Sequence, residues 1–294
     1  MIFDIRKAKN PKVKLTSIPT GNLKLDGGAM FGIIPKVLWS KVYPADENNL
    51  CNFTMRSLLV ETGERNILIE NGIGDKQDEK FMQNYYLNGG DSIEKSLAHI
   101  GLTPDDITDM FLTHLHFDHC GGSIKYNEDH SKLVPAFKNA TYWISERQWQ
   151  WAVNPNYREK GSFLKENILP IKESGQLELI TKEGQLMPDI DVLFVNGHTE
   201  GQAIPFIHYN DKTVVFVADL LPSTAHIPLP WVMAYDIRPL MSIVEKEVFL
   251  KEALEKKYIL YFYHDFYHEC CDLQMTEKGI REKSYSSFPG LFLP

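Results

Sequence analysis

The sequence has no apolar run long enough to cross a membrane. A membrane-spanning helix needs roughly 18 or more consecutive apolar residues, and no stretch of this chain approaches that length. Residues 1–20 contain scattered lysines but lack the apolar core of a signal peptide. These absences predict a soluble, cytoplasmic protein with no membrane partner.

Clustered positive charge is also missing. The chain has 31 Lys and Arg against 39 Asp and Glu, which gives a formal net charge of −8. Proteins that bind nucleic acid neutralise phosphates with clustered basic side chains. We therefore expect no nucleic-acid partner.

Cysteine is scarce and irregularly placed. The four cysteines are Cys51, Cys120, Cys270 and Cys271. Their spacing does not fit a disulfide framework, and the adjacent pair would form only a strained bridge. We expect reduced, buried thiols; a zinc role for the adjacent pair is the less favoured alternative because no CxxC spacing is present.

The chain lacks internal repeats and low-complexity segments, and its composition is that of a globular protein with a sizeable core. Hydrophobic residues make up 43% and aromatic residues 12% of the 294 positions. Large α/β domains commonly reach about 250 residues or more. We predict one domain spanning 1–294, with an N-terminal extension over about 1–50 that either forms a homodimer contact or completes a sheet.

What the sequence does contain is a recurring order in which an apolar strand is followed directly by potential metal ligands. The expected strands are 107–112, 190–195, 213–218 and 258–263. The residues that follow them are His114, His116, Asp118 and His119, then His198, then Asp219, then His264. Because open α/β sheets place their chemistry beyond the carboxyl ends of their strands, we expect these side chains to converge.

The residue types in this set are those that bind zinc-class ions. Zinc is held by neutral imidazole and carboxylate groups, and a catalytic site keeps one position open for water. Alternate residues of a strand-end loop point the same way, so His114 and His116 can meet one ion while Asp118 and His119 turn toward a second. Asp219 could bridge both. We expect two ions about 3.5 to 4 Å apart that share a hydroxide of near-neutral pKa. Zinc is favoured, although manganese, iron or cobalt would suit the same ligands.

Other elements are predicted by hydrophobic period and turn residues. A hairpin is expected over 57–70 with its turn at Gly63, and a helix is expected from the N-cap Ser92 to Ile100. Further helices are expected over 146–153 and 246–257, and the mixed segment 154–170 is expected to cover a pocket.

These motifs resemble the metallo-β-lactamase superfamily over roughly residues 57–265. The resemblance rests on the HxHxDH motif at 114–119, the Gly197-His198-Thr199 segment, Asp219 and His264. It implies an α/β fold of the four-layer αββα sandwich type and a binuclear hydrolase. The metal ligands that it implies are His114, His116, Asp118, His119, His198, the bridging Asp219 and His264.

Within the superfamily, the intervals between the later ligands are similar to those of N-acyl homoserine lactonases and methyl parathion hydrolases. They are 21 residues from His198 to Asp219 and 45 from Asp219 to His264. The resemblance implies a small-molecule lactone or ester substrate, opened by the bridging hydroxide, with Asp118 or Asp219 passing a proton to the leaving oxygen. The alternatives are a phosphotriesterase (organophosphate hydrolase) and, from another class, a metal-binding protein without turnover.

The chain departs from the lactonase pattern at two places. Glu70-Asn71 stands where the family usually has an aspartate, a change expected to be tolerated around the ligands. Pro222 stands where lactonases carry a tyrosine that holds the substrate carbonyl. The nearest alternative donors, and hence candidate catalytic residues, are His226 and Tyr235; otherwise the substrate is not a homoserine lactone.

Several other residues are weaker candidates. Asp236 is expected to accept a hydrogen bond from a ligand imidazole, and His268 is a less favoured rival to His264. His130 and His208 are expected to be structural or exposed. Aromatic residues that could line a pocket, although a core role is the commoner outcome, are Trp149, Tyr157, Trp231, Tyr235 and Phe266.

Overall fold

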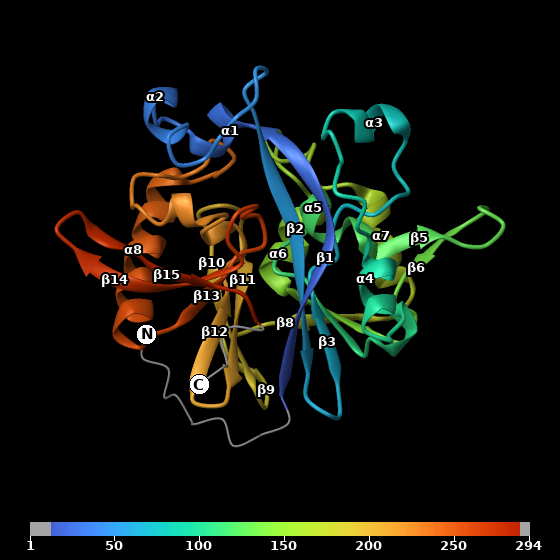
Figure 1. Ribbon diagram of the computed structural model, residues 1–294. Coiled ribbons are helices and arrows are strands. Elements are labelled where there is room, and N and C mark those ends of the chain that lie inside the picture. The colour runs from blue at the N-terminus through green and yellow to red at the C-terminus, as the bar shows by residue number, and fades with distance from the viewer. Residues whose placement is uncertain (1–12, 289–294) are drawn as a thin grey trace.

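The computed structural model describes residues 13–288. Two β-sheets pack face to face, and helices lie on the outer side of each sheet (Figure 1). The expected four-layer αββα sandwich is confirmed.

The first sheet has the strand order β1-β2-β3-β4-β7-β8. Its strands are β1 (Lys14–Asp26), β2 (Leu50–Glu61), β3 (Asn66–Ile69), β4 (Asp109–Phe111), β7 (Thr141–Ser145) and β8 (Leu177–Ile180). Strands β1 to β3 pair antiparallel, whereas β3, β4, β7 and β8 run parallel. The carboxyl ends of the parallel strands therefore meet at one edge.

The second sheet has the order β15-β14-β13-β12-β11-β10-β9. Its strands are β9 (Gly184–Met187), β10 (Ile190–Val195), β11 (Gln202–Tyr209), β12 (Lys212–Phe216), β13 (Ile259–Tyr261), β14 (Cys270–Thr276) and β15 (Gly279–Ser286). A small separate hairpin consists of β5 (Ile124–Tyr126) and β6 (Leu133–Pro135). The C-terminal hairpin β14–β15 did not emerge from the sequence pattern.

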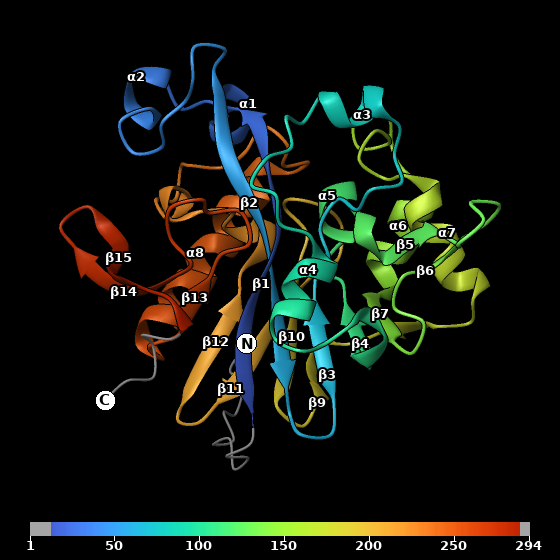
Figure 2. The same cartoon turned by 45° about the vertical axis from the view of Figure 1, so that its right-hand side comes forward.

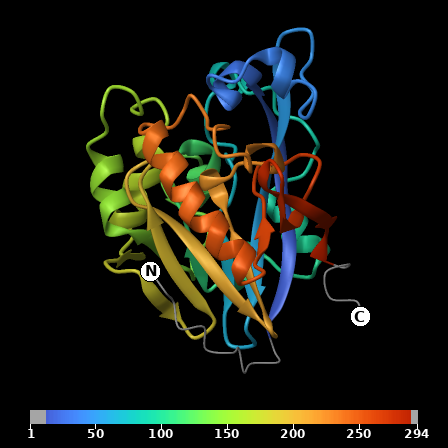
Figure 3. The same ribbon diagram turned by 90° about the vertical axis from the view of Figure 1, so that its left-hand side faces the viewer.

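The helices lie on the outer faces of the sheets and at the upper end of the sandwich in Figure 1. They are α1 (Gly27–Phe31), α2 (Lys36–Trp39), α3 (Glu79–Gln83), α4 (Ile93–His99), α5 (Phe117–Cys120), α6 (Glu146–Val153), α7 (Lys165–Glu173) and α8 (Pro239–Glu255), with short 3-10 turns at Pro104–Asp106, Gly121–Ser123, Ala218–Leu220 and Thr224–His226. Helices α4, α6 and α7 lie on the first sheet (Figure 2). Helix α8, orange in Figure 3, runs diagonally across the second.

The two apolar cores follow the alternation of the strands. In β2, Leu58 and Val60 belong to the large core that includes the space between the sheets, whereas Leu59 between them belongs to the core beneath the helices. Met110 and Phe111 of β4 divide in the same way. Because successive side chains of a strand point to opposite faces, one strand anchors both layers.

Strand direction brings the candidate ligands to one place. Strands β10 and β12 each pair antiparallel with β11, so they run the same way, and β13 is parallel to β12. The residues that follow these three strands therefore share an edge. Hydrogen bonds join that edge to the first sheet: the amide of Thr54 donates to the carbonyl of His264 at 3.2 Å, and that of Arg56 to the carbonyl of Tyr263 at 3.0 Å.

The N-terminal extension completes the first sheet, which is one of the two outcomes expected for it. Strand β1 pairs with β2 along most of its length, and α1 and α2 follow at the upper end of the sandwich in Figure 1. Residues 1–12 of the extension lie outside the described range, and the homodimer contact stays a prediction.

Most of the expected local elements are confirmed, with differences at two helices. The hairpin around Gly63, the helix capped by Ser92 and the helix over 146–153 are present. Helix α8 begins at Pro239, seven residues before the expected start. The prediction placed the start too late because the exposed apolar residues Leu240 and Val244 obscure the amphipathic pattern of the first turns. The expected mixed segment 154–170 ends inside α7, which contains Pro170. Between residues 13 and 288, no helix has both the length and the apolar character needed to span a bilayer.

Replacing Phe216 by Ala should destabilise the fold strongly. Its side chain is fully buried, and its ring centroid lies 5.5 Å from that of Tyr261 and 5.9 Å from that of Tyr263. A buried Phe-to-Ala change costs about 3–5 kcal/mol. Urea unfolding should show that loss for Phe216→Ala and a change within about 0.5 kcal/mol for the control Leu240→Ala, whose residue is 79% exposed. Equal effects of the two changes would contradict this packing.

Candidate metal centre

Contacts with Glu70 hold the residues that lead from β4 into the HxHxDH loop. The amide of Glu70 donates to the carbonyl of Phe111 at 3.0 Å, and the amide of Thr113 donates to Glu70 Oε1 at 2.8 Å. His116 is the N-cap residue of the short helix α5, which carries Asp118 and His119. The loop therefore presents its four polar side chains from a rigid turn.

Three of the expected histidines form one cluster of imidazole nitrogens. His116 Nδ1 lies 3.1 Å from His114 Nε2 and 3.2 Å from His198 Nε2. Asp219 Oδ2 lies 3.2 Å from His198 Nε2 and 4.0 Å from His114 Nε2. We call these three histidines the first triad.

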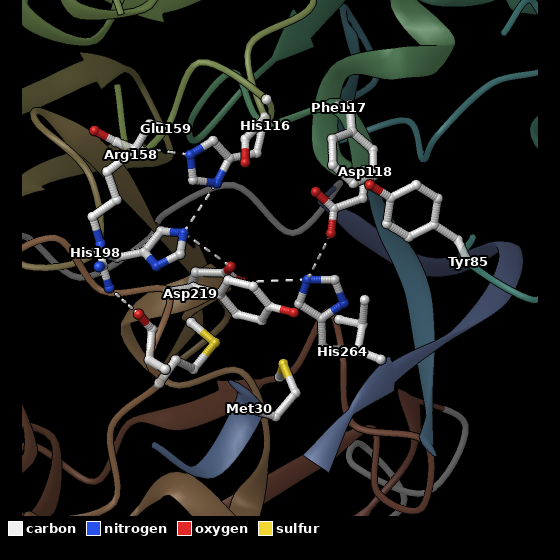
Figure 4. Close-up of a pocket in the computed structure, with 16 residues that line it drawn as sticks. Met30, Tyr85, His116, Phe117, Asp118, Arg158, Glu159, His198, Asp219 and His264 are labelled. Carbon is white, nitrogen blue, oxygen red and sulfur yellow. Dashed lines mark hydrogen bonds and ion pairs between the residues drawn. The ribbon is translucent and has the colours of Figure 1, made fainter. Parts of the chain in front are cut away.

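A second cluster lies on the other side of Asp219. His119 Nε2 and His264 Nε2 are 3.1 Å apart, and Asp118 Oδ2 lies 3.6 Å from His264 Nε2. Asp219 Oδ1 lies 3.5 Å from His119 Nε2 and 3.4 Å from His264 Nε2. Asp118, His119 and His264 form the second triad. Asp219 offers one carboxylate oxygen to each triad, and Figure 4 shows it between His198 and His264.

The outer nitrogens of these rings face acceptors, which fixes their protons. His264 Nδ1 donates to the carbonyl of Thr54 at 2.9 Å, and His198 Nδ1 donates to Asp236 Oδ1 at 3.0 Å. His119 Nδ1 lies 3.2 Å from Glu70 Oε2. A ring that carries its proton on the outer nitrogen has a lone pair on the inner one. The expected role of Asp236 agrees with this contact, and Glu70 reaches a candidate ligand despite the departure from aspartate.

The two triads fit divalent cations. When both rings are neutral and carry their protons on the outer nitrogens, the inner nitrogens of His119 and His264 turn lone pairs toward each other at 3.1 Å, and a cation between them relieves that repulsion. The buried Asp219 Oδ1 has no hydrogen-bond donor among residues 13–288, and such isolation is costly for a carboxylate oxygen. Imidazole and carboxylate are the donors that suit zinc-class ions.

Burial and charge tune the protonation of the cluster. Burial lowers the pKa of His114 well below its usual value, and the neighbouring histidines add to this effect, which favours the neutral ring that binds metal. Burial would raise the pKa of Asp219, but the surrounding histidines outweigh it and hold that pKa well below the usual range. Burial likewise opposes protonation of His119, yet Asp219, Asp118 and Glu70 raise its pKa. The carboxylates of Asp219, Asp118 and Glu70 thus favour positive charge at the histidine cluster.

A pocket of about 480 Å³ opens onto the two triads. Leu25, Met30, Phe117 and Met233 contribute apolar wall, and Tyr85, Arg158 and Tyr235 contribute polar groups. Asp118, His116, His198, Asp219 and His264 also reach its surface (Figure 4).

Of the five aromatic residues considered for the pocket, Tyr235 is the one that lines it. Trp149 is buried in the core beneath the helices, and Trp231 lines a different surface hollow. Tyr157 is 91% exposed. Trp149 thus has the core role that was the commoner expectation, and Trp231, Tyr157 and Phe266 do not line this pocket.

His226 does not reach the pocket, which corrects its assignment as a substrate-contacting residue. Its ring is buried, with Nδ1 2.8 Å from Ser223 Oγ and Nε2 donating to the carbonyl of Met30 at 2.9 Å. The ring also stacks on Phe31 at 4.8 Å between centroids. Both nitrogens are used inside the protein, so His226 anchors α1 and has no donor to offer a substrate.

The remaining histidines lie away from the clusters. His268 stacks on Tyr285, so the strand-end position after β13 belongs to His264. His208 pairs with Asp191 at 2.7 Å, and His130 is exposed. The four cysteines are buried and free, as expected.

Sequence reasoning missed Met30, Tyr85, Arg158 and Glu159. None of them belongs to a motif, and their places depend on contacts between distant segments. The one available signal was regional, since 154–170 was expected to cover a pocket, and Arg158 and Glu159 of that segment do line it.

A family model confirms the resemblance suggested by the motifs: the metallo-beta-lactamase superfamily model matches residues 56–264. The chain belongs to this superfamily. It is accordingly a metal-dependent hydrolase by family. The matched range begins in β2 and ends at the last residue of the second triad.

Several relatives share most of the chain. An N-acyl homoserine lactonase of Bacillus cereus is 26% identical over 271 residues, which cover 87% of this chain and 94% of the relative. A probable metal-dependent hydrolase from Staphylococcus aureus is 33% identical, with a TM-score of 0.85 over 95% of this chain and 98% of that one. AidC, a dizinc quorum-quenching lactonase, shares the fold at 21% identity, with a TM-score of 0.77 over 96% and 97%.

Replacing His226 by Gln should reduce the loss of stability in acid. Burial lowers the pKa of His226 to about 4, whereas an unfolded histidine titrates near 6.5. The unfolded chain therefore binds more protons between these values, and stability falls as the pH falls through that interval. From about pH 7 to pH 5, the wild type should lose about 2 kcal/mol more than His226→Gln.

Urea unfolding of the chelator-treated proteins would measure this difference without a contribution from metal release. Parallel stability curves for wild type and variant would show that His226 does not stay neutral in the folded state.

Proposed function

We propose that this protein is a binuclear metal-dependent hydrolase that opens lactones of the N-acyl homoserine type. The position of Asp219, with one carboxylate oxygen facing each triad, is the observation that carries the proposal. The relatedness to an N-acyl homoserine lactonase over 87% of the chain supports the substrate class.

Each triad has a distinct part in the proposal. The first triad and Asp219 would hold one ion, and the second triad and Asp219 would hold the other. Zinc suits these donors, and manganese, iron and cobalt suit them as well. Two such ions, when bound, lower the pKa of a water toward neutrality and polarise a carbonyl oxygen.

The pocket wall suits an acyl chain beside a polar head. Leu25, Met30 and Met233 provide apolar surface next to the triads, and pockets for small ligands typically have about 300–1,000 Å³. The apolar wall holds the acyl chain and excludes water, while the ester group lies against Asp118 and Tyr235.

Asp118 and Tyr235 supply the proton and the hydrogen bond that ring opening needs. Asp118 faces the pocket with a side chain that is 14% exposed, so it can accept the proton that the attacking water gives up and pass it to the departing alkoxide oxygen. Partial burial and the nearby Asp118 raise the pKa of Tyr235 to about 12. The phenol therefore keeps its proton at neutral pH and donates to the substrate carbonyl oxygen.

Phosphotriester hydrolysis is the second candidate. Pro222 removes the tyrosine that lactonases place three residues after the bridging aspartate, and the triads would serve attack at phosphorus as well as at carbon. A metal-binding protein without turnover is the third reading.

A hydrolysis panel of lactones, thioesters and phosphotriesters, run beside elemental analysis, separates these functions. We expect two ions per chain, lactone opening as the fastest reaction, and loss of turnover after chelation. Asp118→Asn should lower kcat at saturating metal by about 100-fold or more, the usual weight of a general acid. Faster phosphotriester hydrolysis would favour the second candidate, and bound metal with no turnover on the panel would favour the third.

Replacing Tyr235 by Phe should lower kcat/KM for lactones by about 100-fold, because the change removes a donor to the oxygen on which charge develops. Tyr157→Phe is the matched control, since Tyr157 is 91% exposed and does not line the pocket. Unchanged kinetics in Tyr235→Phe would exclude the phenol as the replacement for the missing tyrosine.

A further inference from the structure

Glu159 joins the pocket wall to the first triad. Its side chain is buried, and Oε1 lies 3.5 Å from His116 Nε2. The same oxygen accepts from Thr199 Oγ1 at 2.7 Å, and Thr199 directly follows His198 in the chain. The buried Glu159 carboxylate thus lies against the outer edge of the His116 ring. It also holds Thr199, the residue next to His198.

The other carboxylate oxygen of Glu159 fixes its direction. Oε2 accepts from Trp151 Nε1 at 2.7 Å and from Asn156 Nδ2 at 2.5 Å. With partners on both oxygens, the carboxylate has no freedom to turn away from His116. A ring nitrogen that faces a held carboxylate carries the proton, which leaves the lone pair of His116 on Nδ1, among the inner nitrogens of the triad.

Arg158, next to Glu159 in the chain, contacts the loop that carries Asp236, the hydrogen-bond partner of His198. Its guanidinium donates to the carbonyl of Ala234, and the same nitrogen lies 3.5 Å from the carbonyl of Asp236. Asp236 in turn accepts from His198 Nδ1. Two rings of the first triad are therefore oriented by loops that line the pocket.

The second triad is held differently. The outer nitrogen of His119 faces Glu70, which follows β3, and the outer nitrogen of His264 donates to the carbonyl of Thr54 within β2. Both partners belong to the first sheet. Loss of a pocket-wall contact should therefore disturb the first triad and spare the second.

We propose that Glu159 is a positioning residue that acts through His116 and selectively sets the affinity of the first triad for its metal ion. The inference rests on the proposed binuclear site. Partners of metal-bound histidines fix the ring and its tautomer, and their loss typically weakens metal binding about 10- to 100-fold. Because Glu159 lines the pocket, a residue of the pocket wall would fix the ring and tautomer of His116 at one of the two ion sites.

Zinc titration of the metal-stripped, full-length protein against a chromogenic chelator tests this role without using activity. In Glu159→Gln, one of two zinc affinities should fall by about 10- to 100-fold while the other stays at the wild-type value. His264→Ala damages the second triad and should leave the first triad as the tighter site. Adding Glu159→Gln to His264→Ala should then lower the affinity of that tighter site for zinc.

Two control variants separate positioning from general damage. Glu200→Gln removes a neighbouring carboxylate that pairs with Arg147 and Arg238 and contacts neither triad, so both affinities should stay unchanged. Trp151→Phe removes a hydrogen bond from Glu159 Oε2 but leaves the contact with His116, and should weaken the first affinity much less than Glu159→Gln does.

The outcomes distinguish this role from the proposed function. Unchanged affinities in Glu159→Gln, equal weakening of both, or equal effects of Trp151→Phe and Glu159→Gln would overturn the role of Glu159 while two ions remain bound to the wild type. A wild-type chain that binds fewer than two ions would overturn the proposed binuclear function, and the inference with it.

Discussion

The site depends on one buried carboxylate, Asp219, placed between two groups of imidazole rings. A buried charge is tolerated only when opposite charge or hydrogen bonds compensate its desolvation. Here the rings of His198, His119 and His264 surround the carboxylate. Within residues 13–288 its Oδ1 accepts no hydrogen bond, so a bound cation would complete the compensation. Because these rings come from both sheets, the packing of the sheets and the electrostatics of the site depend on each other.

The convergence of the triads was predictable because it follows from local rules. Each candidate residue comes just after an apolar strand, and the strands that precede them run in one direction within each sheet. The repeated order in the sequence therefore indicated the site and an α/β sheet, whereas the four-layer sandwich was implied by the resemblance to the superfamily. By contrast, the partner of His226 is the carbonyl of Met30, 196 residues away, and no local pattern reports such a contact. Glu159 and Arg158 escaped notice for the same reason.

The change from aspartate to glutamate at residue 70 shows how the structure accommodates a departure from the family pattern. Glu70 adopts a left-handed backbone conformation, with φ of 65°. One of its carboxylate oxygens meets the Thr113 amide and the other faces His119 Nδ1. The longer side chain thus braces the start of the HxHxDH loop and one ring of the second triad together.

The N-terminal strand and the helix after it place Leu25 and Met30 in the pocket wall, although no ligand of either triad comes from that part of the chain. One part of the pocket wall is therefore encoded apart from the residues of the two triads. Substitutions at Leu25 and Met30 would change the shape of that wall without removing any side chain of the two triads, so related chains can differ in the ligands they admit while they keep the same triads.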